Sequence, residues 1–245
     1  MFATINVNGQ FYNGLQMSFG KSRIQYNTFH WTYLRYDRFD VYYYQEGQEV
    51  ARYVARIADK KLSDAEELFY NPLDGRMIFI VYSRLTDFRQ SNIGLVGFSD
   101  EYNIGGTTTI SDNKVSIYFD GNLDHLKKQV SEAVASVVIQ SLLTGSTLRD
   151  KLTGDSGIDL PPWFEKGLEK YSAQEWSVET DAVFKNGFLV GRFHRLASLT
   201  GEDAAIAGQS FWFFVARTYG KGTISDILYL TRVTRDFNQA FYQVL

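Results

Sequence analysis

Residues that could do metal chemistry are few in this chain. Histidines four residues apart on a helix present both imidazoles to a metal ion from one face. The chain has three histidines, His30, His125 and His194, and no two share such a spacing, while cysteine is absent. His125 lies seven residues before Glu132 and could share its helix face, but a lone pair of this kind is typical of a surface or capping histidine.

Nucleophilic and acid–base motifs are incomplete as well. Residues 207–211 lack the second glycine of a nucleophile elbow, and we expect Ser210 at the start of a helix. Glu165 and Glu169 lie four residues apart, but each is followed by a lysine. This repeating charge pattern is typical of a solvated helix face rather than of a catalytic carboxylate pair.

Composition indicates a globular protein with a substantial core. The 245 residues are 44% hydrophobic and 22% charged. A net charge of -3 gives no general attraction to nucleic acid or anionic membranes, so we expect no nucleic-acid partner. We also expect no transmembrane segment, because no apolar run is long enough to cross a bilayer. The lack of cysteine excludes disulfides but fits any compartment.

The first residues allow two interpretations. Residues 1–9 are apolar and small and resemble the tail of a secretory signal, although the basic start and the full apolar core are missing. Alternating Ala3, Ile5 and Val7 fit a first strand equally well. We treat residues 1–26 as an N-terminal segment and residues 27–245 as one continuous domain.

Hydrophobic patterning predicts an α+β domain, with strands in the first half and mostly helices after residue 122. The predicted strands are residues 28–36, 38–44, 76–83, and a hairpin of 105–110 with 114–119. The predicted helices are residues 48–67, as one helix or two, then 122–143, 162–173, 179–186, 207–219, 222–232 and 235–243, with a helical turn at 85–90.

Residues 159–171 resemble the second metal-site segment of gluzincin metallopeptidases, in the peptidase-MA-like branch of that clan. Four residues fall in register with the family pattern: Trp163, Gly167, Leu168 and Tyr171. Where the family has the glutamate that binds zinc, this chain has Lys166, and an ammonium group has no lone pair to donate to a cation. The resemblance therefore implies the fold without a working zinc site.

The helix that carries the remaining zinc ligands in this family corresponds to residues 122–143. The register that we favour puts the family motif on residues 131–135, so that Glu132 keeps the general-base position while Ser131 and Ala135 replace the two histidines. A shift by one residue would put Glu132 and Ser136 at the ligand positions. Because no register restores two histidines, we expect no metal and no other cofactor.

The order of predicted elements over residues 39–245 also resembles the gluzincin plan, which implies a thermolysin-like fold with a mixed N-terminal sheet. Residues 10–17, 90–95 and 102–106 resemble large envelope proteins of Gram-negative bacteria, in which such a degenerate domain precedes a TolB-like β-propeller. The resemblance implies that this chain is the N-terminal part of a longer protein, exported to the periplasm or envelope.

Three alternative functions follow. In the first, which we favour, a pseudopeptidase without catalytic activity binds or scaffolds a protein or peptide partner in the envelope. In the second, an active hydrolase uses Glu132 with an unorthodox ligand set, such as His125, around an open metal position. The third is a purely structural spacer domain without a partner.

The resemblance also predicts where a partner docks. Active relatives bind substrate as an extended strand beside an edge strand, which corresponds here to Gly105, Gly106, Thr107, Thr108, Thr109 and Ile110. β-Branched threonines suit an exposed edge. Alternatively, the aromatic stretch before Phe39 covers this edge. Trp163 and Tyr171 are further candidate binding residues.

Lys166 has two alternative environments. If Glu132 is buried at the vestigial site, the ammonium of Lys166 can supply the positive charge that zinc no longer provides, and the two side chains form an ion pair. Otherwise Lys166 extends to water and Glu132 lies at the surface.

Overall fold

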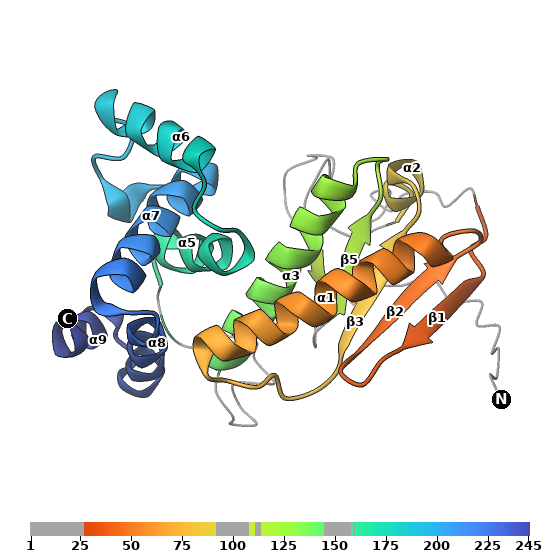
Figure 1. Cartoon of the computed structure of the whole chain (residues 1–245), viewed down its shortest axis with the longest axis horizontal. Helices are drawn as coiled ribbons and strands as arrows, with labels where there is room; N and C mark the ends of the chain where they lie inside the picture. The colour runs from red at the N-terminus through yellow and green to blue at the C-terminus, as the bar shows by residue number, and fades with distance from the viewer. Residues whose placement is uncertain (1–26, 92–107, 111–113, 145–157, 159) are drawn as a thin grey trace, which may run out of the picture. The chain divides into compact units, whose positions relative to one another are not determined.

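The computed structural model of the chain describes residues 27–91, 108–110, 114–144, 158 and 160–245. It confirms an α+β architecture, with a mixed sheet in the N-terminal half and a mostly helical C-terminal half (Figure 1). The chain divides into two compact units. The described residues within 1–60 and 75–133 form the first, named here the sheet unit, and the described residues within 61–74 and 134–245 form the second, the helical unit. The organisation as one continuous domain stays a prediction.

The sheet unit contains a five-stranded sheet in the order β1-β2-β3-β5-β4. The strands are β1 (Trp31–Arg35), β2 (Phe39–Tyr44), β3 (Met77–Tyr82), β4 (Thr108–Ile110) and β5 (Lys114–Tyr118). β1 pairs antiparallel with β2 and β4 pairs antiparallel with β5, whereas β2, β3 and β5 run parallel. Among the described strands, β4 thus forms one edge of the sheet and β1 the other.

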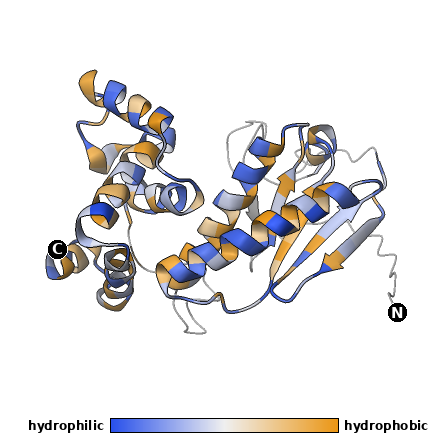
Figure 2. Ribbon diagram, in the orientation of Figure 1, coloured by the Kyte–Doolittle hydropathy of each residue, from blue (hydrophilic) through white to orange (hydrophobic). Residues whose placement is uncertain are grey.

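Helix α1 (Gln48–Phe69) makes the connection between the parallel strands β2 and β3. A parallel pair requires such a long crossover, because a tight turn can join only antiparallel neighbours. Its buried residues recur at helical spacing, from Ala51 through Val54, Ala55 and Ala58. Figure 2 shows hydrophilic residues interspersed with these along α1, as expected of a helix with one face against a sheet.

The end of the sheet near the short helix α2 (Leu85–Phe88) holds an aromatic cluster. Its buried residues are Phe29, Trp31, Tyr44, Ile80, Tyr82, Phe88 and Tyr118. The hydroxyl of Tyr44 donates a hydrogen bond of 2.7 Å to the buried carboxylate of Asp87. Burial raises the pKa of Tyr44, with a smaller contribution from this hydrogen bond, so the phenol keeps its proton and remains a donor.

The helical unit contains α5 (Pro162–Ala173), α6 (Val178–Leu189), α7 (Gly201–Tyr219), α8 (Gly222–Thr234) and α9 (Phe237–Val244), with a 3-10 turn at Leu196–Ser198. Helices α5 and α7 touch through two glycines. A Cβ atom on Gly208 would lie 1.9 Å from the carbonyl oxygen of Trp163, and one on Gly167 would lie 2.3 Å from the Cα of Gly208. Glycine is required at both positions because the two backbones are in contact.

Most predicted elements are present, but several of their predicted limits differ from those observed. Residues 48–67 belong to one helix, α1, which continues to Phe69. The helix predicted at 207–219 begins at Gly201, so the expectation that Ser210 opens a helix is wrong. Ser210 lies in the interior of α7, where its Oγ donates to the carbonyl of Ala207 at 2.8 Å. The N-terminal segment 1–26 lies outside the described residues.

Within the described part of the chain, no helix is both long and apolar enough to cross a membrane.

Candidate functional site

Helix α3 (Leu123–Thr144) carries the three residues predicted at the vestigial zinc site. Ser131 is buried, and its Oγ donates to the carbonyl of Lys127 at 2.8 Å. Ala135 is also buried and offers no ligand atom. Glu132 keeps a third of its side chain exposed and lies 3.8 Å from the Nζ of Lys128, one helical turn earlier. Of the two positions at which the resemblance predicts replaced histidines, one thus holds a methyl group, and the other a hydroxyl that is bonded to its own helix.

Helix α5 carries Lys166, the residue predicted to stand at the position of a third zinc ligand. Its side chain is half exposed, and its Nζ lies 2.8 Å from Oε2 of Glu169. Glu169 is buried, and its Oε1 has no hydrogen-bond partner among the described residues. The prediction that Glu165 and Glu169 form a solvated face is therefore wrong. The charge repeat did not reveal that α5 turns this side of the helix toward the protein interior.

Glu165 is affected by the same burial. Desolvation raises the pKa of its carboxyl group, and the negative charge of Glu169 raises it further, while Lys166 opposes both effects. Glu165 therefore holds its proton to a higher pH than an exposed glutamate does. Two carboxylates and one ammonium on adjacent turns of α5 form a partly buried charged cluster at this position.

The predicted ion pair between Lys166 and Glu132 stays a prediction, because Lys166 belongs to the helical unit and Glu132 to the sheet unit. Within their own helices, Lys166 pairs with Glu169 and Glu132 pairs with Lys128.

His125 lies in the first turn of α3, as expected for a capping or surface histidine. Its Nδ1 lies 2.5 Å from Oδ2 of Asp120, and this hydrogen bond lowers the pKa of the Asp120 carboxyl group. In the part of the chain that the structure describes, no three histidine or carboxylate side chains come together in a way that could hold a metal ion.

The predicted docking strand is described in part. Gly105, Gly106 and Thr107 lie outside the described residues, while Thr108, Thr109 and Ile110 form β4 at an edge of the described sheet. The alternative that the aromatic stretch before Phe39 covers this edge is wrong for residues 31–35. They form β1, which pairs with β2 at the opposite edge of the sheet.

Trp163 and Tyr171, the remaining candidate binding residues, are not at an open surface. Trp163 is 7% exposed and packs among aromatic rings, with centroids 5.2 Å from Phe211 and 6.4 Å from Phe241. Tyr171 is half-buried, and burial raises the pKa of its phenol. Trp163 thus has a packing role in the helical unit, while a binding role for either residue stays a prediction.

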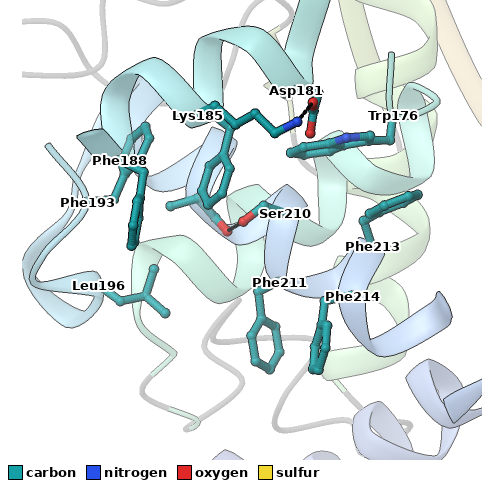
Figure 3. A pocket seen from close by; sticks show the side chains of 12 residues that line it. Trp176, Asp181, Lys185, Phe188, Phe193, Leu196, Ser210, Phe211, Phe213 and Phe214 are labelled. Atoms are coloured by element: carbon teal, nitrogen blue, oxygen red, sulfur yellow. Dashed lines mark hydrogen bonds and ion pairs between the residues drawn. The ribbon is translucent and has the colours of Figure 1, made fainter. Parts of the chain in front are cut away.

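The structure also shows a cavity that motif searching missed. It has a volume of about 490 Å³ and lies between α6, the segment after it, and α7 (Figure 3). Its lining includes Trp176, Asp181, Phe184, Lys185, Phe188, Phe193, Leu196, Ala207, Ser210, Phe211, Phe213 and Phe214. The available signal was the phenylalanine spacing, since Phe184 and Phe188 lie one helical turn apart on α6.

Comparison of the sequence with models of protein families and with curated proteins found no match.

Proposed function

We propose that this chain is a non-catalytic, metallopeptidase-like binding module of the bacterial envelope, built on a gluzincin-like variant of its α+β fold. The observation that carries the proposal is the state of the three ligand positions. They hold a buried serine bonded to its own helix, a buried alanine, and a lysine paired with Glu169. None of the three side chains presents the imidazole or carboxylate that zinc prefers.

A metal assay tests the loss of the zinc site. Purified protein, incubated with excess zinc and dialysed, is expected to hold far less than one zinc per chain by elemental analysis, because lysine, serine and alanine are poor zinc ligands. The same sample is expected to cleave no peptide in a chelator-sensitive way. Stoichiometric zinc, or cleavage that chelator abolishes and zinc restores, would support an active hydrolase that uses Glu132.

The partner of such a module is a protein or peptide that adds a strand beside β4. Backbone hydrogen bonds along an edge strand need no metal ion, so this mode of binding can survive the loss of the zinc site. The position of β4 at an edge of the described sheet supports the proposal. If the chain is a spacer domain instead, no partner binds there.

A pair of substitutions on β4 tests strand addition. Thr108→Pro removes a backbone donor, and we expect it to weaken capture of a partner from envelope extract. Thr108→Val is the matched control, since it keeps the donor and the β-branched shape. Circular dichroism and thermal unfolding establish that both variants are folded. Equal capture by wild-type protein and by a folded Thr108→Pro variant would rule out docking at this edge.

A further inference from the structure

The cavity between α6 and α7 has the size and the walls of a binding site. Ligand pockets in proteins have volumes of roughly 300–1,000 Å³ and mostly apolar linings, and this one has about 490 Å³. Two pairs of stacked rings contribute to its walls. Trp176 stacks on Phe213 with centroids 5.2 Å apart and an interplanar angle of 14°, and Phe184 stacks on Phe193 at 5.3 Å and 9°.

The polar groups in the lining bond to one another. The Nζ of Lys185 lies 2.6 Å from Oδ2 of Asp181, so the two charges compensate each other. The hydroxyl of Ser210 donates to the carbonyl of Ala207, as described above. Figure 3 shows the ion pair beside the ring of Trp176 at one side of the cavity. Because the lining has no net charge, it matches a neutral occupant.

The two sides of the cavity differ in exposure. Phe193 and Ala207, on its inner side, are buried. Phe188 and Phe214, at its rim, are 67% and 55% exposed, so the cavity is open to solvent. A pocket that suits a free small molecule encloses most of that molecule, whereas an open pocket with aromatic rims suits side chains that project from a larger partner.

We propose that this cavity binds neutral aromatic side chains of a protein partner, which pack against the rings of Trp176, Phe188 and Phe214. Aromatic rings contribute large apolar contact areas and prefer offset or edge-to-face packing against other rings. The proposal rests on the proposed binding function and names the chemistry of the partner. It concerns a surface of the helical unit, separate from the β4 edge of the sheet unit.

The test uses a defined peptide and the full chain. The probe is an acetylated and amidated tetrapeptide with phenylalanine at both ends and two central glycines. Its binding is followed by NMR through the indole N–H signals of the four tryptophans. We expect the signal of Trp176 to move on titration while that of the buried Trp31, which belongs to the sheet unit, stays unchanged. The analogue with leucine at both ends is expected to bind about tenfold more weakly, which corresponds to about 1.4 kcal/mol.

Two double variants locate the binding site. Phe188→Ser with Phe214→Ser removes the exposed rim rings and is expected to weaken binding of the peptide about tenfold or more. The matched control is Tyr229→Ser with Tyr242→Ser, which removes two exposed rings, 57% and 91% accessible, from α8 and α9. The control is expected to bind like the wild type. Because all four rings are mostly exposed, neither variant should unfold the protein.

Three results would overturn the proposal: an unmoved Trp176 signal at saturating peptide, equal affinity for the leucine analogue, or equal weakening in the two double variants. The zinc assay remains independent of this outcome. Stoichiometric zinc with intact peptide binding would overturn the proposed function alone, and zinc-free protein without peptide binding would overturn this proposal alone.

Discussion

Glu169 is a buried residue of α5. Its carboxylate pairs with the half-exposed ammonium of Lys166. Lys166→Ala would leave this carboxylate buried without that donor. We expect the free energy of unfolding to fall by about 1–3 kcal/mol, the usual cost of an unsatisfied buried polar group. Urea denaturation at pH 7 measures the change.

A matched control for this substitution is Lys185→Ala, because Lys185 also pairs with an acidic residue of its own helix but is 70% exposed. Exposed pairs contribute little to stability, so this variant should unfold close to the wild type. The interaction with Glu169 is isolated by a double-mutant cycle that includes Glu169→Gln. A coupling free energy near zero in this cycle would show that Lys166 does not stabilise Glu169.

Glu165 should make stability depend on pH in the direction opposite to an ordinary paired carboxylate. Burial and the charge of Glu169 raise its pKa in the folded state, so the folded chain binds more protons than the unfolded chain between the two pKa values. Protonated Glu165 makes its full contribution to stability at a pH below its pKa in the unfolded chain, which is about 4.3 for glutamate. This contribution is lost as the pH rises through the pKa of Glu165 in the folded chain.

Glu165→Gln removes this titration. The variant should be more stable than the wild type at pH 7, and the difference should disappear as the pH falls to about 3, where Glu165 is almost fully protonated in both states. Thermal unfolding between about pH 3 and pH 8 measures both curves. A difference that stays constant over this range would show that the ionisation of Glu165 is not its cause.

The residue-scale chemistry was only partly predictable. The identity of Lys166 is read directly from the sequence, but its assignment to a zinc-ligand position stays a prediction. The burial of Glu169 was not predictable, because Glu-Lys repeats occur on solvated helices and depend on what packs against them. The pairing of Lys166 with Glu169, three residues later, follows from helix geometry alone once α5 is known.

At the scale of elements, the contact between α5 and α7 is the most sensitive packing feature. Gly208→Ala would place a methyl group 1.9 Å from the Trp163 carbonyl oxygen, so the helices would have to move apart. We expect a loss of about 1–3 kcal/mol or more in the free energy of unfolding, as for other overpacked interiors. Chemical denaturation followed by circular dichroism measures it.

Gly222→Ala is the control for that substitution. Gly222 is the first residue of α8, and an added Cβ would meet no atom within 4 Å. Alanine is favoured over glycine in helices, so this variant should be as stable as the wild type or slightly more stable. A Gly208→Ala variant that unfolds like Gly222→Ala would show that α5 and α7 can separate without cost.

Element limits were predictable where the chain has strong local signals. The predicted limits of α5 match, because Pro162 fits the first turn of a helix and a missing N–H costs nothing there. The start of α7 was missed, since Gly201 is a weak helix former and its φ of 57° is unusual for a helix start. Strand order could not be predicted, because β3 and β5 pair across a long stretch of chain that local patterns do not describe.

At the scale of the whole molecule, the class of architecture followed from the order of predicted strands and helices. The cavity did not, because its walls come from Trp176, from α6 and from α7, and no sequence motif links these segments. The spacing of apolar residues along one helix indicates which of its faces is apolar. It does not indicate whether the apolar faces of two helices pack completely or leave space between them.

Each of the two units is formed by two separate stretches of the chain. The division falls between Lys60 and Lys61 within α1, and between Ala133 and Val134 within α3. During synthesis, residues 61–74 therefore leave the ribosome well before residues 134–245, with which they form the helical unit. That unit cannot be completed until residues 134–245 have been made. Neither unit corresponds to one uninterrupted stretch of the coding sequence, so recombination at a single point could not transfer either one without part of the other.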